Sequence, residues 1–118
     1  MNVQEFILKT KANTINIYSC MELYSKYLGE WPDFVLRLIS NCQDTLFLDD
    51  GKRVLSFTEI LNAETELHVD FSDKGLLPLV DCGDNDFIVY SFKEKNWALF
   101  NIVDEVLFHK ADSIESLI

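Results

Sequence analysis

The sequence is poor in the residues that build catalytic loops and disulfide frameworks. Its 118 residues include four glycines, two prolines and three cysteines. Four glycines leave little material for a phosphate-binding loop, and the phosphate-loop, dinucleotide-binding and nucleophile-elbow motifs are absent from the sequence. Cys20, Cys42 and Cys82 are odd in number and widely spaced, so we interpret them as free thiols of a reducing compartment. Nucleotide-dependent catalysis is therefore not expected.

Long apolar runs are also missing. The longest, such as Leu76–Val80, have the length of a strand and fall far short of the roughly 18 residues that span a bilayer. Glu5 interrupts the only apolar patch near the N-terminus, where a signal peptide needs a continuous apolar stretch. These absences predict a soluble, cytoplasmic protein that has no membrane partner.

An excess of acidic side chains is the strongest positive feature of the composition. The chain holds 20 acids against 10 bases, for a net charge of −10. Acids and bases balance in residues 1–40, so the whole excess lies in residues 41–118, which hold 16 acids and six bases. Such a charge repels nucleic acid and anionic lipid and attracts basic proteins. Solubility alone is the alternative explanation.

Periodicity and capping signals predict three helices before residue 45. The first spans about Asn2–Thr10. In the second, Ser19 and Glu22 have the spacing of a capping box, and Gly29 is placed to end the helix. The third begins at Trp31-Pro32-Asp33, where proline needs no N–H donor and aspartate complements the helix dipole. The apolar positions of these helices are Val3, Phe6, Ile7, Tyr18, Met21, Leu23, Tyr24, Leu28, Phe34, Val35, Leu38, Ile39 and Cys42.

A hairpin and a capped helix are predicted next. Two apolar segments, Leu46–Leu48 and Val54–Leu55, flank an Asp-Gly pair that tolerates the positive φ angles of a tight turn. Ser56 and Glu59 repeat the capping-box spacing and predict a short helix that ends at residue 61 or 62. Residues 62–74 are polar and acidic, and we expect mostly loop there, with a short strand at Leu67–Phe71.

Three apolar segments, with a candidate fourth at Glu105–His109, follow at spacings too short for helices between them, so they are predicted to form an antiparallel meander. These segments are Leu76–Val80, Phe87–Phe92, Trp97–Val103 and Glu105–His109. A last short helix is expected from Asp112. The prediction is therefore a single α+β domain over residues 1–118, with an antiparallel or mixed β-sheet packed against a layer of helices.

The connection from Asp81 to Asp86 places three carboxylates between two predicted strands. Clustered acids can bind a hard cation, but the calcium-loop pattern fails because Lys95 falls where the last, bidentate ligand is needed. A solvated β-turn is the alternative. His68 and His109 are far apart, and no zinc-site spacing is present. We predict no catalytic residue, no metal site and no cofactor.

Short motifs in a consistent order resemble the SUKH superfamily, which comprises Smi/Knr-like and Syd-like proteins. Trp31-Pro32-Asp33-Phe34 is similar to a helix start of that family, and the capped segment Ser56–Leu61 also matches. Leu77–Phe87 resembles its strand-turn-strand around an acidic turn, and Val106–Ile114 resembles its last strand and helix. The similarity covers about residues 17–118. Asn41-Cys42-Gln43 departs from it, since the family has Asn-Gly there.

The resemblance implies an α+β fold and a non-enzymatic role, most often that of a bacterial immunity protein that binds and neutralises a cognate toxin. Our leading hypothesis is that the protein partner is a basic toxin domain, attracted by the acidic surface. A nuclease toxin fits this hypothesis, because carboxylates can take the place of the phosphates that a nuclease binds. A regulatory adaptor in a signalling or cell-wall pathway is the alternative. A metal-dependent hydrolase that uses Asp84 and Asp86 is a further one. The oligomeric state is left open.

Acids in predicted loops and turns are the candidates for the partner-binding surface, because these segments are expected to be exposed. The candidates are Asp49, Asp50, Glu64, Glu66, Asp70, Asp73, Asp81, Asp84 and Asp86.

Overall fold

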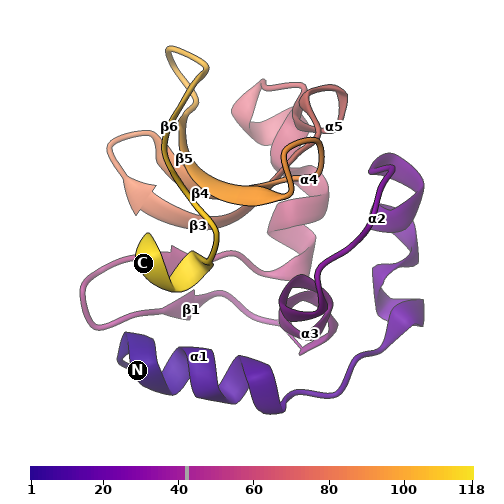
Figure 1. Ribbon diagram of the computed structural model, residues 1–118, viewed down its shortest axis with the longest axis vertical. Coiled ribbons are helices and arrows are strands. Elements are labelled where there is room, and N and C mark those ends of the chain that lie inside the picture. Colours follow the sequence, from indigo (N-terminus) through magenta and orange to yellow (C-terminus); the bar gives the residue numbers. More distant parts are fainter. Residues whose placement is uncertain (42) are drawn as a thin grey trace.

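The β-sheet determines how the rest of the chain is arranged (Figure 1). The structure, a computed structural model, describes residues 1–41 and 43–118, without the side chains of Ser19 and Asn41. The described residues form a six-stranded sheet in which every neighbouring pair is antiparallel, and this confirms the predicted meander. In sheet order the strands are β1 (Leu46–Phe47), β2 (Arg53–Val54), β3 (Leu76–Gly83), β4 (Asp86–Ser91), β5 (Asn96–Asn101) and β6 (Val106–Ala111).

The described helical segments are α1 (Val3–Ala12), α2 (Met21–Lys26), α3 (Asp33–Asn41), α4 (Phe57–Leu67) and α5 (Phe71–Lys74), with two 3-10 helices, η1 (Ile17–Cys20) and η2 (Ile114–Ser116). They cover both faces of the sheet, whereas one helical layer was expected. Trp97 and Phe100 are three residues apart on β5 and so point to opposite faces. The ring of Phe34 on α3 lies 6.2 Å from that of Trp97, and the ring of Phe71 on α5 lies 5.9 Å from that of Phe100. Within the described ranges, no helix combines the length and the apolar character needed to cross a membrane.

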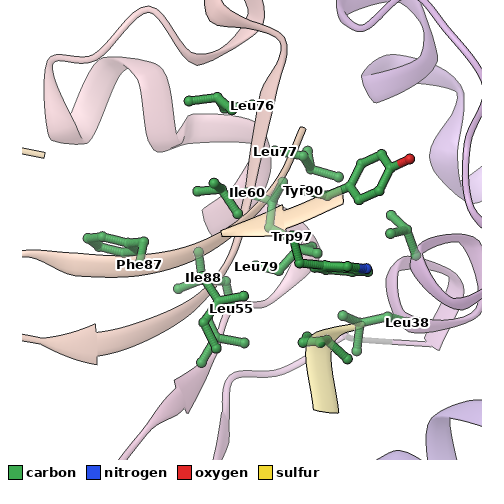
Figure 2. Packing of buried hydrophobic residues seen from close by; sticks show 14 of the residues in the cluster. Leu38, Leu55, Ile60, Leu76, Leu77, Leu79, Phe87, Ile88, Tyr90 and Trp97 are labelled. Atoms are coloured by element: carbon green, nitrogen blue, oxygen red, sulfur yellow. The ribbon is translucent and has the colours of Figure 1, made fainter. Parts of the chain in front are cut away.

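The core lies between the sheet and these two groups of helices. Leu76–Val80 on β3 and Phe87–Ser91 on β4 are buried along their whole length, as expected for strands that are covered on both faces. Figure 2 shows Leu38 from α3 and Ile60 from α4 among the side chains of the central strands. Trp97 is buried in this core, in agreement with its place in an apolar segment.

The helix starts at Asn2 and Asp33 agree with the predictions. Asn2 caps α1 by accepting a hydrogen bond from the Glu5 N–H at 2.8 Å. Asp33 opens α3 and forms a 2.6 Å ion pair with Arg37 one turn later. On the inward face of α3, Val35, Leu38 and Ile39 are buried. Cys42, predicted to extend that face and counted among the free thiols, lies outside the described residues.

The prediction for the second helix is wrong in start, end and face. The helix begins at Met21 behind Cys20, which makes no side-chain cap, and the predicted cap Ser19 belongs to η1 instead. Tyr18, Met21 and Leu28, predicted as apolar contacts, are exposed, and Leu28 is 89% accessible. The buried positions are Cys20, Leu23 and Tyr27, and the Tyr27 ring packs 5.3 Å from that of Phe92, which turns this face of the helix towards the core. The helix ends at Lys26, before Gly29.

The capping box at Ser56 and Glu59 is confirmed, but α4 is longer than predicted. It continues to Leu67 and ends at His68, which has the left-handed φ of 57°. The predicted strand at Leu67–Phe71 is wrong, since α5 follows almost at once. Ala63 is buried one turn after Ile60, so a sparse helical stripe continues through the polar segment. The last predicted helix is reduced to the 3-10 turn η2.

Candidate partner-binding surface

The turn between β3 and β4 is stabilised by hydrogen bonds to two of the predicted acids, Asp81 and Asp86. Asp84 and Asn85 have φ angles of 52° and 66°, the conformation of a two-residue hairpin turn that aspartate and asparagine tolerate. The Asp81 carboxylate accepts a hydrogen bond from the Gly83 N–H at 2.9 Å. Asp86 accepts one from the Asn101 side-chain amide on β5, also at 2.9 Å. Asp84 is exposed at the tip of the turn.

A second turn, between β5 and β6, is joined to the first. The Ile102 N–H donates to the Asn85 carbonyl at 2.9 Å. Asn101 accepts hydrogen bonds from the N–H groups of Val103 and Asp104, both at 3.0 Å. The Asp104 side chain is exposed beside the β3–β4 turn as a result. Asp104 is not among the predicted acids; its position between two apolar segments indicates a turn, but its contact with the β3–β4 turn is not visible in the sequence.

An ion cluster lies behind these turns and joins α4 to the sheet. Arg53 on β2 donates from Nη1 to Glu59 and from Nη2 to Asp81, the latter at 3.2 Å. Thr45 also donates to Glu59. Burial acts to raise the pKa of Glu59, but hydrogen bonds from Thr45, Arg53 and Ser56 outweigh it and hold the pKa below its ordinary value. The hydrogen bond to Glu59 in turn raises the pKa of Arg53.

A small cleft of about 70 Å³ between α4 and the sheet connects this cluster to Glu66. Its lining includes Arg53, Glu59, Glu66, Asp81 and Phe87, and Phe87 is the chain neighbour of Asp86. The cleft and the two turns lie at the same end of the β3–β4 hairpin, because Asp81 lines the cleft and also bonds to the Gly83 N–H in the first turn. We call the surface at this end the acidic rim and define it as Glu66, Asp81, Asp84, Asp86 and Asp104.

The predicted acids of the β1–β2 hairpin are not part of the rim. Asp49 is bound by the amino group of Met1 at 2.8 Å. Asp50 pairs with Lys52 at 2.7 Å, and hydrogen bonds from Lys52 lower the pKa of its carboxyl. Both charges are thus largely balanced where they stand.

The remaining predicted acids gather near α5, and the helix replaces the expected loop there. Glu64 on α4 accepts a hydrogen bond from the Ser72 hydroxyl at 2.9 Å and lies 3.8 Å from Lys26. Asp70 precedes α5. Asp73 lines two surface grooves together with Lys74 and Lys93. The nine predicted acids are therefore divided among the rim, the β1–β2 hairpin and the surroundings of α5. Near α5, Glu64 and Asp73 lie close to lysines.

The chemistry available at the rim is that of carboxylates, of which Glu66, Asp84 and Asp104 are exposed and Asp81 and Asp86 are half-buried. Within residues 1–41 and 43–118, no three His, Cys, Asp or Glu side chains are placed to hold a metal ion. Cys82 on β3 is half-buried, and burial raises the pKa of its thiol to about 11, so this thiol is not an activated nucleophile.

Comparison of the chain with family models, with curated proteins and with solved structures gives no match.

Proposed function

We propose that this domain binds a basic protein partner through the acidic rim. The observation that carries the proposal is the charge balance of the five rim carboxylates. Among the described residues, the base that pairs with a rim carboxylate is Arg53. It binds Asp81, and it also pairs with Glu59. Glu66, Asp84, Asp86 and Asp104 have no cationic partner in that part of the chain.

A group of exposed and half-buried carboxylates with so few cations near it attracts a basic surface from a distance and adds specificity on contact. The partner that we favour is the catalytic domain of a toxin. The rim carboxylates would bind the basic site of that domain in place of the phosphate groups of its substrate. The domain would then be an immunity protein of the SUKH type. The α+β architecture and the resemblance of residues 17–118 to that superfamily support this form of the proposal.

Co-expression with a toxin encoded beside the gene tests the proposal. We expect the protein to suppress toxicity and to form a complex on gel filtration. The triple variant D84N/D86N/D104N should lose both effects, and the Asn side chain at position 86 can still accept the hydrogen bond from Asn101. The control variant D49N/D70N/D73N changes the charge by the same amount outside the rim and should still protect.

Unchanged toxicity together with the absence of a complex would overturn the immunity role. A stable complex with a basic protein that is not a toxin, sensitive to the triple variant, would favour the regulatory adaptor and keep the rim as its binding surface. Equal loss of protection in the control variant would show that net charge matters and that the rim does not.

A further inference from the structure

The strand β6 ends the sheet beside the acidic rim, and its outer edge is open. Among the described strands, β6 pairs with β5 alone. It is six residues long, whereas β1 at the opposite edge has two residues. A long unpaired edge presents backbone N–H and C=O groups that an added strand can bind.

Apolar side chains remain partly uncovered along this edge. Val106 is 52% exposed, and Val103 in the preceding turn is 69% exposed. Leu107 and Phe108 are neighbours on β6, so they point to opposite faces of the sheet, and both are only half-buried. An additional strand next to β6 would cover apolar surface on both faces.

Acidic side chains flank the same strand at both ends. Asp104 comes directly before β6 and Asp112 directly after it, and neither forms an ion pair with a described residue. The neighbouring acids Glu105 and Glu115 are already paired, with Lys74 at 3.3 Å and Lys11 at 3.0 Å. Within β6, Lys110 is engaged in a 3.0 Å ion pair with Glu94. The edge therefore fits an extended segment whose centre is apolar and whose two ends are basic.

These charges decide between the possible occupants. An antiparallel pair of two copies through β6 would bring Asp104 and Glu105 of one copy towards Asp112 of the other. A parallel pair would set each acid beside its own counterpart. Both arrangements oppose like charges across adjacent strands, and each copy also carries a net charge of −10. A second copy is disfavoured for this reason, and a basic segment is favoured.

A bulge limits how much of the edge can be used. Leu99 pairs with Phe108 and Trp97 with Ala111, so β6 contains one extra residue between these two pairs. His109 occupies the bulge with a φ of 50°. The regular part of the edge is thus Val106–Phe108, next to Asp104 of the acidic rim.

We propose that Val106–Phe108 is a docking edge, to which the basic partner adds a short extended segment with alternating apolar side chains and flanking Lys or Arg residues. This inference rests on the proposed function and specifies how the partner binds. The rim supplies long-range attraction and one charged end of the contact, and β6 supplies backbone hydrogen bonds.

Titration of the isotope-labelled full chain with the synthetic peptide Lys-Lys-Thr-Val-Thr-Val-Thr-Lys-Lys tests the docking edge by NMR. We expect shifts and slower amide exchange within Val106–Phe108. A peptide of the same charge with proline in place of both valines cannot add a strand and should leave exchange there unchanged. The variant D104N/D112N should bind the first peptide about fivefold more weakly, as expected for two lost surface pairs, whereas D49N/D50N should not.

Equal binding of the two peptides, with shifts confined to Glu66, Asp84 and Asp86, would overturn the docking edge while the rim remained a binding surface. Absence of any change at β6 with the first peptide would overturn it as well, and co-expression with the partner would still test the proposed function separately. Slowed exchange at β6 that depends on protein concentration without peptide would show that a second copy occupies the edge.

Discussion

Arg53 and Asp81 stand directly opposite each other on β2 and β3, with Arg53 Nη2 3.2 Å from Asp81 Oδ2. The same guanidinium also binds Glu59 at the start of α4. One side chain therefore ties the helix to two strands, and it supplies the cation for two half-buried carboxylates.

Replacing Arg53 with Met should destabilise the fold by about 1–3 kcal/mol at neutral pH, since hydrogen bonds between charged groups are lost and two carboxylates stay partly desolvated. Urea unfolding followed by circular dichroism measures the change. K52M is the matched control, because it breaks the more exposed pair with Asp50 and should cost at most about 1 kcal/mol. Equal losses in the two variants would contradict a special role of Arg53.

The pH dependence of stability should reveal Glu59. Its pKa is lowered on folding from the ordinary 4.5, so the unfolded chain binds more protons in acid. The contribution of Glu59 to stability is therefore complete above about pH 4.5 and is lost as the pH falls through the folded-state pKa. E59Q should show a shallower decrease in unfolding free energy between about pH 5 and pH 3, while Gln keeps the capping box.

Urea unfolding at several pH values gives this slope. The control variant E66Q removes a carboxylate of the same type from an exposed position on α4. If E59Q and the unchanged protein lose stability in parallel across this pH range, the hydrogen bonds from Thr45 and Arg53 do not stabilise the charged form of Glu59.

Features set by neighbouring residues could be predicted from the sequence. The capping box of Ser56 and Glu59 requires residues three apart, and the β3–β4 turn requires Asp84 and Asn85 to accept positive φ angles. The spacing of apolar segments from residue 76 onwards allowed no helix between strands, so antiparallel pairing was predictable too.

Features set by distant partners could not be predicted. Asp81 was selected as an exposed acid, but its cation Arg53 is 28 positions away in the sequence. Which face of α2 is buried depends on where Tyr27 packs. The Tyr27 ring lies 5.3 Å from that of Phe92, a residue distant in the sequence that follows β4. Asp104 joins the rim through the contact between two turns, which no local pattern encodes.

The β4–β5 turn contains a position where glycine would be more stable. Lys95 has a φ of 57°, which costs a residue with a Cβ atom roughly 1–2 kcal/mol. After the entropy that glycine loses on folding, K95G should gain about 0.5–1 kcal/mol. The lost pair with Glu30 matters little because both side chains are mostly exposed. Chemical unfolding measures the gain, and K93G in the same turn is the control, because Lys93 lacks a positive φ and should gain nothing.

Cys82 should react slowly with iodoacetamide in the folded protein. Its thiol pKa is raised by burial from 9.0 to about 11, so the thiolate fraction at neutral pH is about a hundredfold below that of an ordinary cysteine. Mass spectrometry of the Cys82 peptide gives the rate, and the same chain in urea is the reference. The folded-state rate should keep rising tenfold per pH unit beyond pH 9, where the unfolded reference levels off. A folded-state rate equal to the reference at pH 7 would identify an activated thiol, and Cys82 would then have to be considered as a nucleophile.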